Sequence, residues 1–570
     1  MTPPASRRAL HWAPLLTLLV MLGPVLAGVA GTVAPALGWY PALGRTDLGL
    51  DVFRELFAWP GIGTSIWLSV FCGVVATAIS LAVVILSAAA WEGTPVFRAI
   101  QRLLSPLLAV PHAAAAFGLA FLIAPSGWLA RLLSPWATGW EQPLDLLIIH
   151  DRAGFALIAG LVVKEVPFLL LMLLAALPQA DAPRRRQVAE ALGYGRISAW
   201  IKVVLPAVYP QLRLPIYAVL AYAMSNVDMA LILGPTAPPP LAVQILTWMN
   251  DPDLALRLRS AAAAVVQMGL VAGVLLLWRL GEVALGRCGR RRAEAGHRGA
   301  GSSAEIIFKT IGLTAVLISG LAVVLGLVVL ALWSVAGLWT FPSALPDAMS
   351  LRNWSRQGPS LVTPFWLTLQ IGALAVLAAV VFVIACLEAE YRHGIQPGSR
   401  ALWLLYLPLI VPQVGFLTGI QTLMIGVGLD GHWLAVTAAH LIFVLPYVFL
   451  SLADPWRAWD PRFGTVAAAL GAGPGRILWS IRLPMLLAPL LTAAAVGFAV
   501  SVGQFLPTLL IGGGRVATLT TEAVALVSGG DRRLIGVTAI VQGLLPFIGF
   551  LLALVLPMIV YANRRSMKGT

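Results

Sequence analysis

The stretch ALGYGRISAWIKVVLP, residues 191–206, identifies the architecture of the chain, because a close copy, ALGAGPGRILWSIRLP, returns at residues 469–484. Both copies are basic and helix-prone, and both lie between long apolar runs. When residues 187–206 are aligned with 465–484, at an offset of 278, eight of the twenty positions are identical. The chain therefore contains an internal repeat.

The composition is that of an integral membrane protein. Hydrophobic residues make up 59% of the 570 residues and charged residues 11%, whereas soluble domains are about 25% charged. A segment of about 20 apolar residues spans a bilayer, and in lipid its backbone must be helical. We therefore predict an all-α membrane protein of about twelve spans, at 12–34, 63–90, 104–124, 152–178, 212–234, 260–281, 307–338, 361–387, 402–428, 434–452, 484–510 and 533–562.

The distribution of Lys and Arg predicts the topology. Twelve is an even number, so both termini lie on the same side, and the loops on that side hold most of the basic residues. By the positive-inside rule this side is the cytoplasm. The net charge of +14 then reflects topology, and we expect membrane lipid and no nucleic acid as a partner. We predict a multi-pass protein of the bacterial cytoplasmic (inner) membrane, whose first span is either retained or removed as a signal peptide.

A basic segment divides the chain into two halves. LGRCGRRRAEAGHRGAGSSAE, residues 285–305, is rich in Gly, Arg and Ser and has no apolar periodicity, so it predicts a cytoplasmic linker. Six predicted spans precede it and six follow. The predicted organisation is a first half at 1–284 (core 61–281), a linker at 285–306 and a second half at 307–570 (core 361–561).

Each copy of the repeated stretch lies between the fourth and fifth spans of its half. Residues 184–192 predict a short helix, and Gly193 can adopt the left-handed conformation that ends it. Residues 196–204 predict a second, amphipathic helix, and Leu205-Pro206 introduces the next span. The second copy repeats this order from 462 to 484. The alternatives are a docking element or a helix that lies on the inner leaflet.

This stretch resembles the signature of the type I, binding-protein-dependent importer permeases of the ATP-binding-cassette (ABC) family. The signature has Glu-Ala-Ala, then a Gly, then the Pro of a Leu-Pro pair thirteen residues after that Gly, as from Gly193 to Pro206. In that family the segment is the coupling helix, which binds a separate ATPase subunit. The resemblance assigns ATPase coupling to Gln187, Ala189, Gly193, Leu205 and Pro206, and to Thr465, Ala467, Gly471, Leu483 and Pro484. Gln187 and Thr465 stand where the family has Glu, so that charge is absent.

The two halves in one chain resemble the fused permeases of the ferric-iron and thiamine importer group. GQFLPTLLIGGGRVATLTTEAVAL, residues 503–526, is similar to a thiamine-type branch. The resemblance implies a permease subunit that forms the translocation pathway, two copies of a cytoplasmic P-loop ATPase and an extracytoplasmic solute-binding protein. Thiamine-like compounds or ferric iron are the solutes that it suggests.

The chain has no ATPase motif of its own. A P-loop needs Lys directly after Gly, and none of the four lysines follows a glycine. ATP and Mg²⁺ are therefore expected on the partner ATPase, and this chain is predicted to bind no cofactor. The seven histidines have no metal-ligand or acid–base spacing, so we predict no catalytic or metal-binding residue and no enzyme. The alternative function is a twelve-span secondary transporter driven by an ion gradient.

Polar residues inside spans are costly and often functional. The candidates for lining the pathway are Asn226, Asp228, Ser501, Gln504, His112 and Gln413, and more weakly His440. The alternative is that they join helices through hydrogen bonds. For the adjacent Lys164 and Glu165 we expect structural pairing, with each other or with neighbouring groups, over contact with the solute. One acid and several amides fit a small polar or cationic solute.

Overall fold

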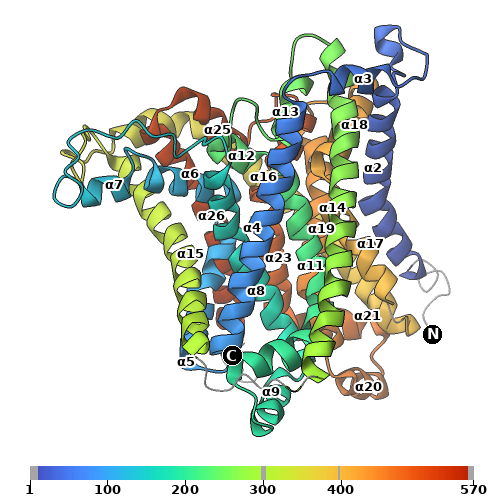
Figure 1. Ribbon diagram of the computed structural model, residues 1–570. Helices are drawn as coiled ribbons and strands as arrows, with labels where there is room; N and C mark the ends of the chain where they lie inside the picture. The colour runs from blue at the N-terminus through green and yellow to red at the C-terminus, as the bar shows by residue number, and fades with distance from the viewer. Residues whose placement is uncertain (1–9, 295, 297–302, 396–397, 563–570) are drawn as a thin grey trace.

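The computed structural model describes residues 10–294, 296, 303–395 and 398–562. Every regular element in this part of the chain is a helix, and the long helices run side by side from one end of the molecule to the other (Figure 1). Ten described helices are long and apolar enough to cross a membrane, or twelve if two sharply bent pairs each count as one span. The predicted all-helical membrane fold is confirmed.

The elements follow the chain in two similar series. The first series is α2 (Ala13–Ala36), η1 (Pro41–Leu43), α3 (Asp51–Phe57), α4 (Ile62–Trp91), α5 (Pro95–Leu104), η2 (Ser105–Ala109), α6 (His112–Ile123), α7 (Trp128–Leu133), α8 (Phe155–Gln179), α9 (Ala182–Ala191), α10 (Arg196–Ala199), η3 (Trp200–Val204), α11 (Leu205–Ser225), α12 (Asp228–Leu233), α13 (Leu241–Met249) and α14 (Ala255–Glu294). The second series is α15 (Ser303–Val335), α16 (Arg352–His393), α17 (Ser399–Ile410), α18 (Gln413–Gly426), α19 (Trp433–Arg457), α20 (Pro461–Ala469), α21 (Pro474–Ile477), η4 (Leu478–Arg482), α22 (Leu483–Met485), α23 (Leu487–Val502), α24 (Leu506–Gly512), α25 (Leu519–Ala525), η5 (Leu526–Gly529) and α26 (Arg532–Val560).

The internal repeat keeps one register from α8 to α13 of the first half. Helices α8, α10, α11, α12 and α13 begin 278 residues before α19, α21, α22, α24 and α25, respectively. This is the same offset that aligns the two copies of the repeated stretch in the sequence. The two halves are therefore two copies of one fold, and each residue from α8 to α13 has a counterpart in the other half.

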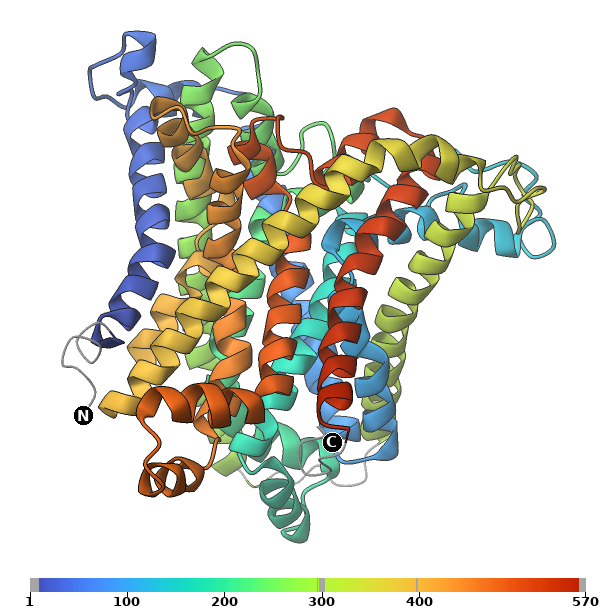
Figure 2. The same ribbon diagram turned by 180° about the vertical axis from the view of Figure 1, so that it is seen from behind.

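The first long helix of each series packs against the opposite half. Helix α2 lies along α18, and α15 lies against α4, α6 and α26 (Figure 1). Small residues bring these helices close together, as at Gly28 beside Phe416 and at Gly118 beside Gly326. The Thr32 and Thr418 hydroxyls also meet at 3.1 Å across α2 and α18. The two halves are thus interlocked, and α16 crosses the back of the bundle obliquely (Figure 2).

Several predicted spans are broken, which corrects the sequence analysis. The predicted spans 104–124 and 402–428 each contain a Val-Pro pair, Val110-Pro111 and Val411-Pro412, where the backbone is extended and the helix restarts at the next residue. Proline lacks the N–H that a continuous helix needs, and it disfavours helical geometry at the preceding residue. Helices α17 and α18 consequently meet at a bend of 80°.

The spans predicted at 212–234 and 484–510 are broken too. The first divides into α11 and α12, because the Asn226 side chain accepts a hydrogen bond from the Met229 N–H at 2.9 Å and starts a new helix. In the second, the helices on either side of Leu486 meet at a bend of 75°.

The predicted linker begins as a helix. Helix α14 continues through its first ten residues to Glu294, because Arg, Ala and Glu have favourable helix propensities. Residues 295 and 297–302 of the predicted linker lie outside the described residues, and α15 starts at Ser303.

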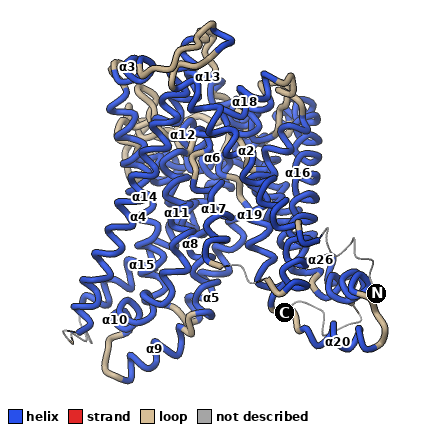
Figure 3. Tube along the Cα trace, turned by 90° about the vertical axis from the view of Figure 1, so that its right-hand side faces the viewer, coloured by secondary structure: helices blue, strands red, loops and turns tan. Residues whose placement is uncertain are grey.

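The short helices of the two repeated stretches lie at one end of the bundle. Figure 3 shows α9 and α20 projecting there from opposite sides. Helix α2 begins and α26 ends at this same end (Figures 1 and 2). Both ends of the described chain therefore lie on the side of the repeated stretches, as the even number of spans predicts.

The close contact between α2 and α18 gives a prediction. A Cβ atom at Gly419 would collide with the Gly28 carbonyl oxygen and lie 2.6 Å from the Thr32 nitrogen, and both of these are backbone atoms that have no room to move. We expect Gly419→Ala to destabilise the protein by about 1–3 kcal/mol, the usual cost of overpacking. The measurement is thermal unfolding of the purified chain in detergent.

Gly426→Ala is the matched control, because it lies on the same helix and a Cβ there meets nothing within 4 Å. Equal melting temperatures for the two variants would contradict the proposed close packing of the halves.

Candidate functional site

The two repeated stretches have the same local structure. We call residues 184–206 the first repeated segment and residues 462–484 the second repeated segment. In each, a helix ends at a glycine in the left-handed conformation, Gly193 with φ 86° and Gly471 with φ 83°, and a second helix follows. Each second helix passes through one turn of π-helix (η3 and η4) before the Leu-Pro pair. The predicted helix–turn–helix is confirmed in both copies.

Each repeated segment exposes the same pair of aliphatic residues. Val188 in α9 and Leu192 directly after it are 56% and 60% exposed, and their counterparts Val466 in α20 and Leu470 directly after it are 60% and 83% exposed. They are four residues apart, so each pair lies on one helix face. Two large aliphatic side chains exposed side by side at the same position of both segments form an apolar surface. Exposed apolar surfaces of this kind are typical of sites that another protein covers.

The other predicted coupling residues surround this exposed face or support it. Gln187 and Thr465 are exposed beside the aliphatic pairs. Ala189 and Ala467 face inward and are 2% and 8% exposed. Leu205 is half-buried and Pro206 exposed, whereas their counterparts Leu483 and Pro484 are buried and half-buried. A role of these ten residues in coupling stays a prediction.

An ion-pair cluster, which we call the first anchor, holds the first repeated segment to α4. Glu92 directly follows α4 and is only 5% exposed. Arg186 donates to its carboxylate at 2.9 Å and to its backbone carbonyl at 2.7 Å. Arg196 donates to the Ala90 carbonyl at 2.7 Å and also to the Glu92 carbonyl. These arginines satisfy carbonyls at the negative end of the α4 dipole, where a cation is favourable.

A second anchor holds the second repeated segment to α16. Arg482, 1% exposed, donates to the Glu388 carboxylate at 2.5 Å, and Arg392 donates to the other carboxylate oxygen at 2.7 Å. The Arg482 guanidinium lies 3.6 Å from the centre of the Tyr391 ring and 4.1 Å from that of the Trp459 ring. Aromatic faces stabilise a desolvated guanidinium. Buried charges that are paired and enclosed in this way resist separation.

The two anchors have the same role but differ in construction. Arg186 and Arg196 correspond to Gly464 and Pro474 in the second half, and Arg482 corresponds to Val204 in the first. The repeat therefore conserves the attachment of the segment but not the residues that make it. Sequence comparison of the halves had no signal for these anchors, because aligned positions carry different side chains.

The polar residues predicted to line the pathway are all in the membrane part of the bundle, and most have local partners. Asn226 donates to the Asp228 carboxylate at 2.8 Å, and both residues lie at the break between α11 and α12. Ser501 and Thr508 bond to the two ring nitrogens of His440, each at 2.8 Å. This buried network joins α19, α23 and α24. His440 and Ser501 therefore fit the role of interhelical hydrogen bonding, the alternative to lining the pathway.

The other candidates are less constrained. The His112 ring lies 5.0 Å from the Tyr222 ring, centre to centre, and His112 is partly exposed. Gln504 and Gln413 are also partly exposed within the bundle. Whether these residues line a pathway stays a prediction.

Of the two expected arrangements for Lys164 and Glu165, Lys164 pairs with neighbouring groups and not with Glu165. The Lys164 ammonium donates to the carbonyls of Val110 and Leu107, at 2.6 and 3.3 Å. Adjacent side chains on a helix point about 100° apart, and the break before α6 leaves carbonyl groups that this ammonium reaches. No ion pair involving Glu165 occurs among the described residues.

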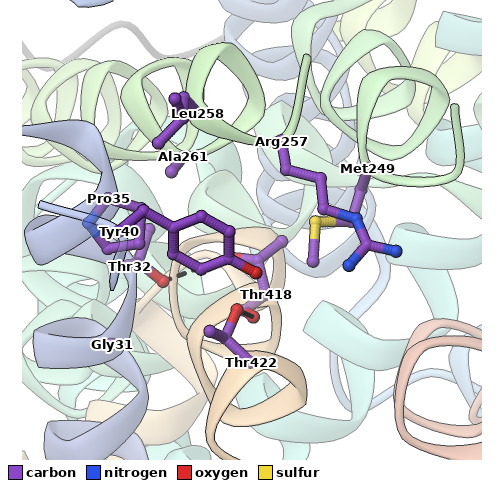
Figure 4. A pocket seen from close by; sticks show the side chains of 10 residues that line it. All are labelled: Gly31, Thr32, Pro35, Tyr40, Met249, Arg257, Leu258, Ala261, Thr418 and Thr422. Carbon is purple, nitrogen blue, oxygen red and sulfur yellow. Dashed lines mark hydrogen bonds between the residues drawn. The ribbon is translucent and has the colours of Figure 1, made fainter. Parts of the chain in front are cut away.

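A small pocket lies at the opposite end of the bundle, between α2, α14 and α18 (Figure 4). Its polar lining includes Thr32, Thr418 and Arg257. The pocket is part of the interface at which α2 packs on the second half.

Comparisons with known proteins cover both halves. No protein-family model matches the chain. The chain is 32% identical over 531 residues to the inner membrane ABC transporter permease protein YnjC of Escherichia coli, a match that covers 92% of this chain and 94% of the relative. It is 31% identical over 179 residues to the molybdenum transport system permease protein ModB of Mycobacterium tuberculosis, covering 29% of this chain and 66% of the relative. It is 25% identical over 202 residues to the putrescine transport system permease protein PotI of Escherichia coli, covering 34% and 71%.

The second anchor gives a prediction of stability. Glu388→Gln leaves the buried Arg482 without its counter-charge, and removing one partner of a buried pair costs about 3–5 kcal/mol. We expect a clear fall in the melting temperature of the purified chain. The double variant Glu388→Gln/Arg482→Met removes both charges and should recover much of the loss.

Asp51→Asn serves as the control, because its pair with Arg54 is exposed and exposed pairs contribute about 0–1 kcal/mol. If Glu388→Gln melts like Asp51→Asn, the second anchor does not hold the segment.

Proposed function

The chain belongs to the ABC transporter permeases, and from this premise we propose that it is the complete membrane part of a binding-protein-dependent importer, with two permease halves fused. Its halves would together form the translocation pathway for the solute. A match that spans 92% of the chain, and so both halves, supports this reading over that of a single permease half. The family assignment also removes the alternative of a secondary transporter.

The observation that carries the proposal is the duplicated aliphatic pair on the repeated segments. Val188 with Leu192, and Val466 with Leu470, are exposed at equivalent positions of the two repeated segments. An apolar pair at the same position of two equivalent helices fits two copies of one partner, bound to one half each. We assign that partner as a cytoplasmic P-loop ATPase, which would hold ATP and Mg²⁺.

The anchors would pass the motion of the ATPase to the membrane helices. When ATP binding closes the two ATPase subunits, α9 and α20 would approach each other. Because α9 is tied to α4 through Glu92, and the second repeated segment to α16 through Glu388, each segment would move together with a membrane helix. Helices α11 and α23 follow the segments directly in the chain and would open the pathway outward; hydrolysis would reset it.

The proposed orientation places both repeated segments and both termini in the cytoplasm. The excess of Lys and Arg on the loops at that side supports this orientation. The membrane is then the bacterial inner membrane, in agreement with the name of the inner membrane permease YnjC. An extracytoplasmic binding protein would deliver the solute to the opposite end of the bundle.

The candidate solutes come from the relatives and from the sequence resemblance. Two relatives are described as permeases of a molybdenum and of a putrescine transport system, so similarity alone does not choose one solute. The sequence resemblance adds thiamine-like compounds and ferric iron as candidates.

The test is purification of the tagged chain from its own membranes in mild detergent, with identification of the co-purifying proteins by mass spectrometry. We expect a P-loop ATPase at two copies per chain. Val188→Asp/Leu192→Asp and Val466→Asp/Leu470→Asp should each reduce its recovery by about tenfold, because a charge in the centre of an apolar contact removes roughly 1.4 kcal/mol or more of affinity.

Ala468→Asp is the control for a single added carboxylate and is compared with Val466→Asp alone, since Ala468 is an exposed position of α20 that lies 200° around the helix from Val466. Recovery of the chain without an ATPase, together with transport that needs no ATP, would refute the proposal. Equal losses for the control and the test variants would refute the docking surface alone.

A further inference from the structure

Helices α14 and α26, the last long helices of the two series, each carry an arginine at the same place. Arg257 and Arg532 each lie ten residues before a fully buried glutamine, Gln267 in α14 and Gln542 in α26. Helix α14 packs against α2 and α18, and α26 packs in the same way against α15 and α6. The two arginines therefore occupy equivalent positions in two equivalent helix contacts, and their surroundings can be compared directly.

The contact around Arg532 is closed. The Arg532 guanidinium donates to the backbone carbonyl and to the hydroxyl of Ser126, at 3.2 and 2.7 Å. It lies 5.6 Å from the centre of the Phe121 ring and 5.4 Å from that of the Trp333 ring. Aromatic faces stabilise a guanidinium. The protein itself therefore supplies the partners of Arg532.

The contact around Arg257 is open, because α18 has threonines where α6 has phenylalanines. Both helices begin directly after a proline, which aligns their residues. Thr418 then corresponds to Phe117. Thr422 corresponds to Phe121, the residue whose ring covers Arg532. Thr418, Thr422 and Arg257 all line the small pocket between α2, α14 and α18. The pocket therefore lies where the equivalent contact is filled by aromatic rings.

The Arg257 side chain has no partner within the described residues. It makes no hydrogen bond or ion pair there, and its Nε atom is enclosed. The two preceding acids, Asp251 and Asp253, accept backbone N–H groups at the turn into α14 instead, each at 2.9 Å. Figure 4 shows Tyr40, Thr422 and Arg257 entering the pocket from three sides. An enclosed polar group without a partner is costly, and a bound ion removes that cost.

The pocket lies where a lipid headgroup can reach it. Helix α2 is peripheral, since its Leu19 and Leu26 are 58% and 62% exposed. It ends shortly before Trp39, which is 46% exposed, and Tyr40, which lines the pocket. Aromatic residues at the end of a spanning helix are typical of the membrane–water boundary. This end of α2, and the pocket beside it, is therefore at headgroup depth.

We propose that this pocket binds an oxyanion, whose source is either the phosphate of a phospholipid headgroup or a free anion such as inorganic phosphate. The planar guanidinium of Arg257 binds two oxygens of the ligand, and the Tyr40 hydroxyl donates to a third. The Thr418 and Thr422 hydroxyls already donate to carbonyls of their own helix, so these threonines contribute space. The pocket is small, so it accepts the oxygens of one such group while any acyl chains stay in the lipid.

The bound group joins the two halves. Helices α2 and α14 belong to the first half and α18 to the second, so an oxyanion held among them reinforces the interlocked contact. This inference goes beyond the proposed importer function and does not depend on it.

The test is thermal unfolding of the full-length chain in detergent, after removal of lipid, at constant ionic strength and with increasing concentrations of five probes. Dihexanoyl phosphatidylglycerol and glycerol 3-phosphate present the headgroup with and without acyl chains, and inorganic phosphate and sulfate are free oxyanions. Dihexanoylglycerol has the chains but no phosphate. We expect the oxyanion probes, but not dihexanoylglycerol, to raise the melting temperature in a saturable way. An apparent Kd about tenfold lower for phosphatidylglycerol than for glycerol 3-phosphate identifies lipid as the source, and equal values identify a free anion.

Three variants locate the site. Arg257→Gln should raise the apparent Kd by about tenfold or more, because it removes charge-assisted hydrogen bonds. Thr422→Phe installs the residue that α6 has at the equivalent position and should close the pocket to the probes. Arg54→Gln is the matched control, because Arg54 is an exposed arginine on α3, at the same end of the bundle (Figure 1), and should not affect the apparent Kd.

The proposal is overturned if the oxyanion probes raise the melting temperature no more than dihexanoylglycerol does. It is also overturned if Arg257→Gln binds the probes like the unaltered chain, if Arg54→Gln loses as much affinity, or if a folded Thr422→Phe variant still binds them. If Thr422→Phe does not fold, the comparison of Arg257→Gln with Arg54→Gln decides. None of these measurements needs an ATPase, so the importer proposal can fail independently.

Discussion

The ion pairs of Glu92 and Glu388 are the contacts on which the rest of the arrangement depends. A repeated segment that only rested on the bundle surface would bend when a partner moved it, because exposed ion pairs contribute about 0–1 kcal/mol. Here both carboxylates are buried and each accepts from arginine, so separating segment and helix would expose an unpaired charge to an apolar environment. The segment and its membrane helix can therefore behave as one rigid body.

The interlocked packing of the halves complements these anchors. Because α2 packs on α18 and α15 on α6, neither half can move away from the other without opening a glycine-lined contact. In lipid such contacts depend on close packing and not on the hydrophobic effect, which makes the small residues essential. Under the proposed function, a force applied at α9 or α20 would therefore produce relative motion inside the bundle, where α11 and α23 lie.

Much of the fold followed from the sequence, because its signals are local. Runs of about 20 apolar residues predicted the spans, and the identical Gly and Leu-Pro positions predicted the repeat, its offset and the left-handed turns at Gly193 and Gly471. The breaks at Val110-Pro111 and Val411-Pro412 were also encoded locally, but a hydropathy pattern averages over a single proline. The anchors and the partners of Lys164 were not predictable, since they join residues that are 54 to 106 positions apart.

The differences between the halves are as informative as their similarity. Helix α8 carries Lys164 and Glu165, whereas α19 has Ile442 and Phe443 at the same positions. The helix therefore forms with or without these two charges. Lys164 illustrates this: the helix break before α6 leaves carbonyls that its ammonium satisfies, yet the equivalent break before α18 forms with Ile442 in its place. The charge of Lys164 is therefore satisfied locally by backbone carbonyl groups, but the helix that carries it does not need that charge in order to form.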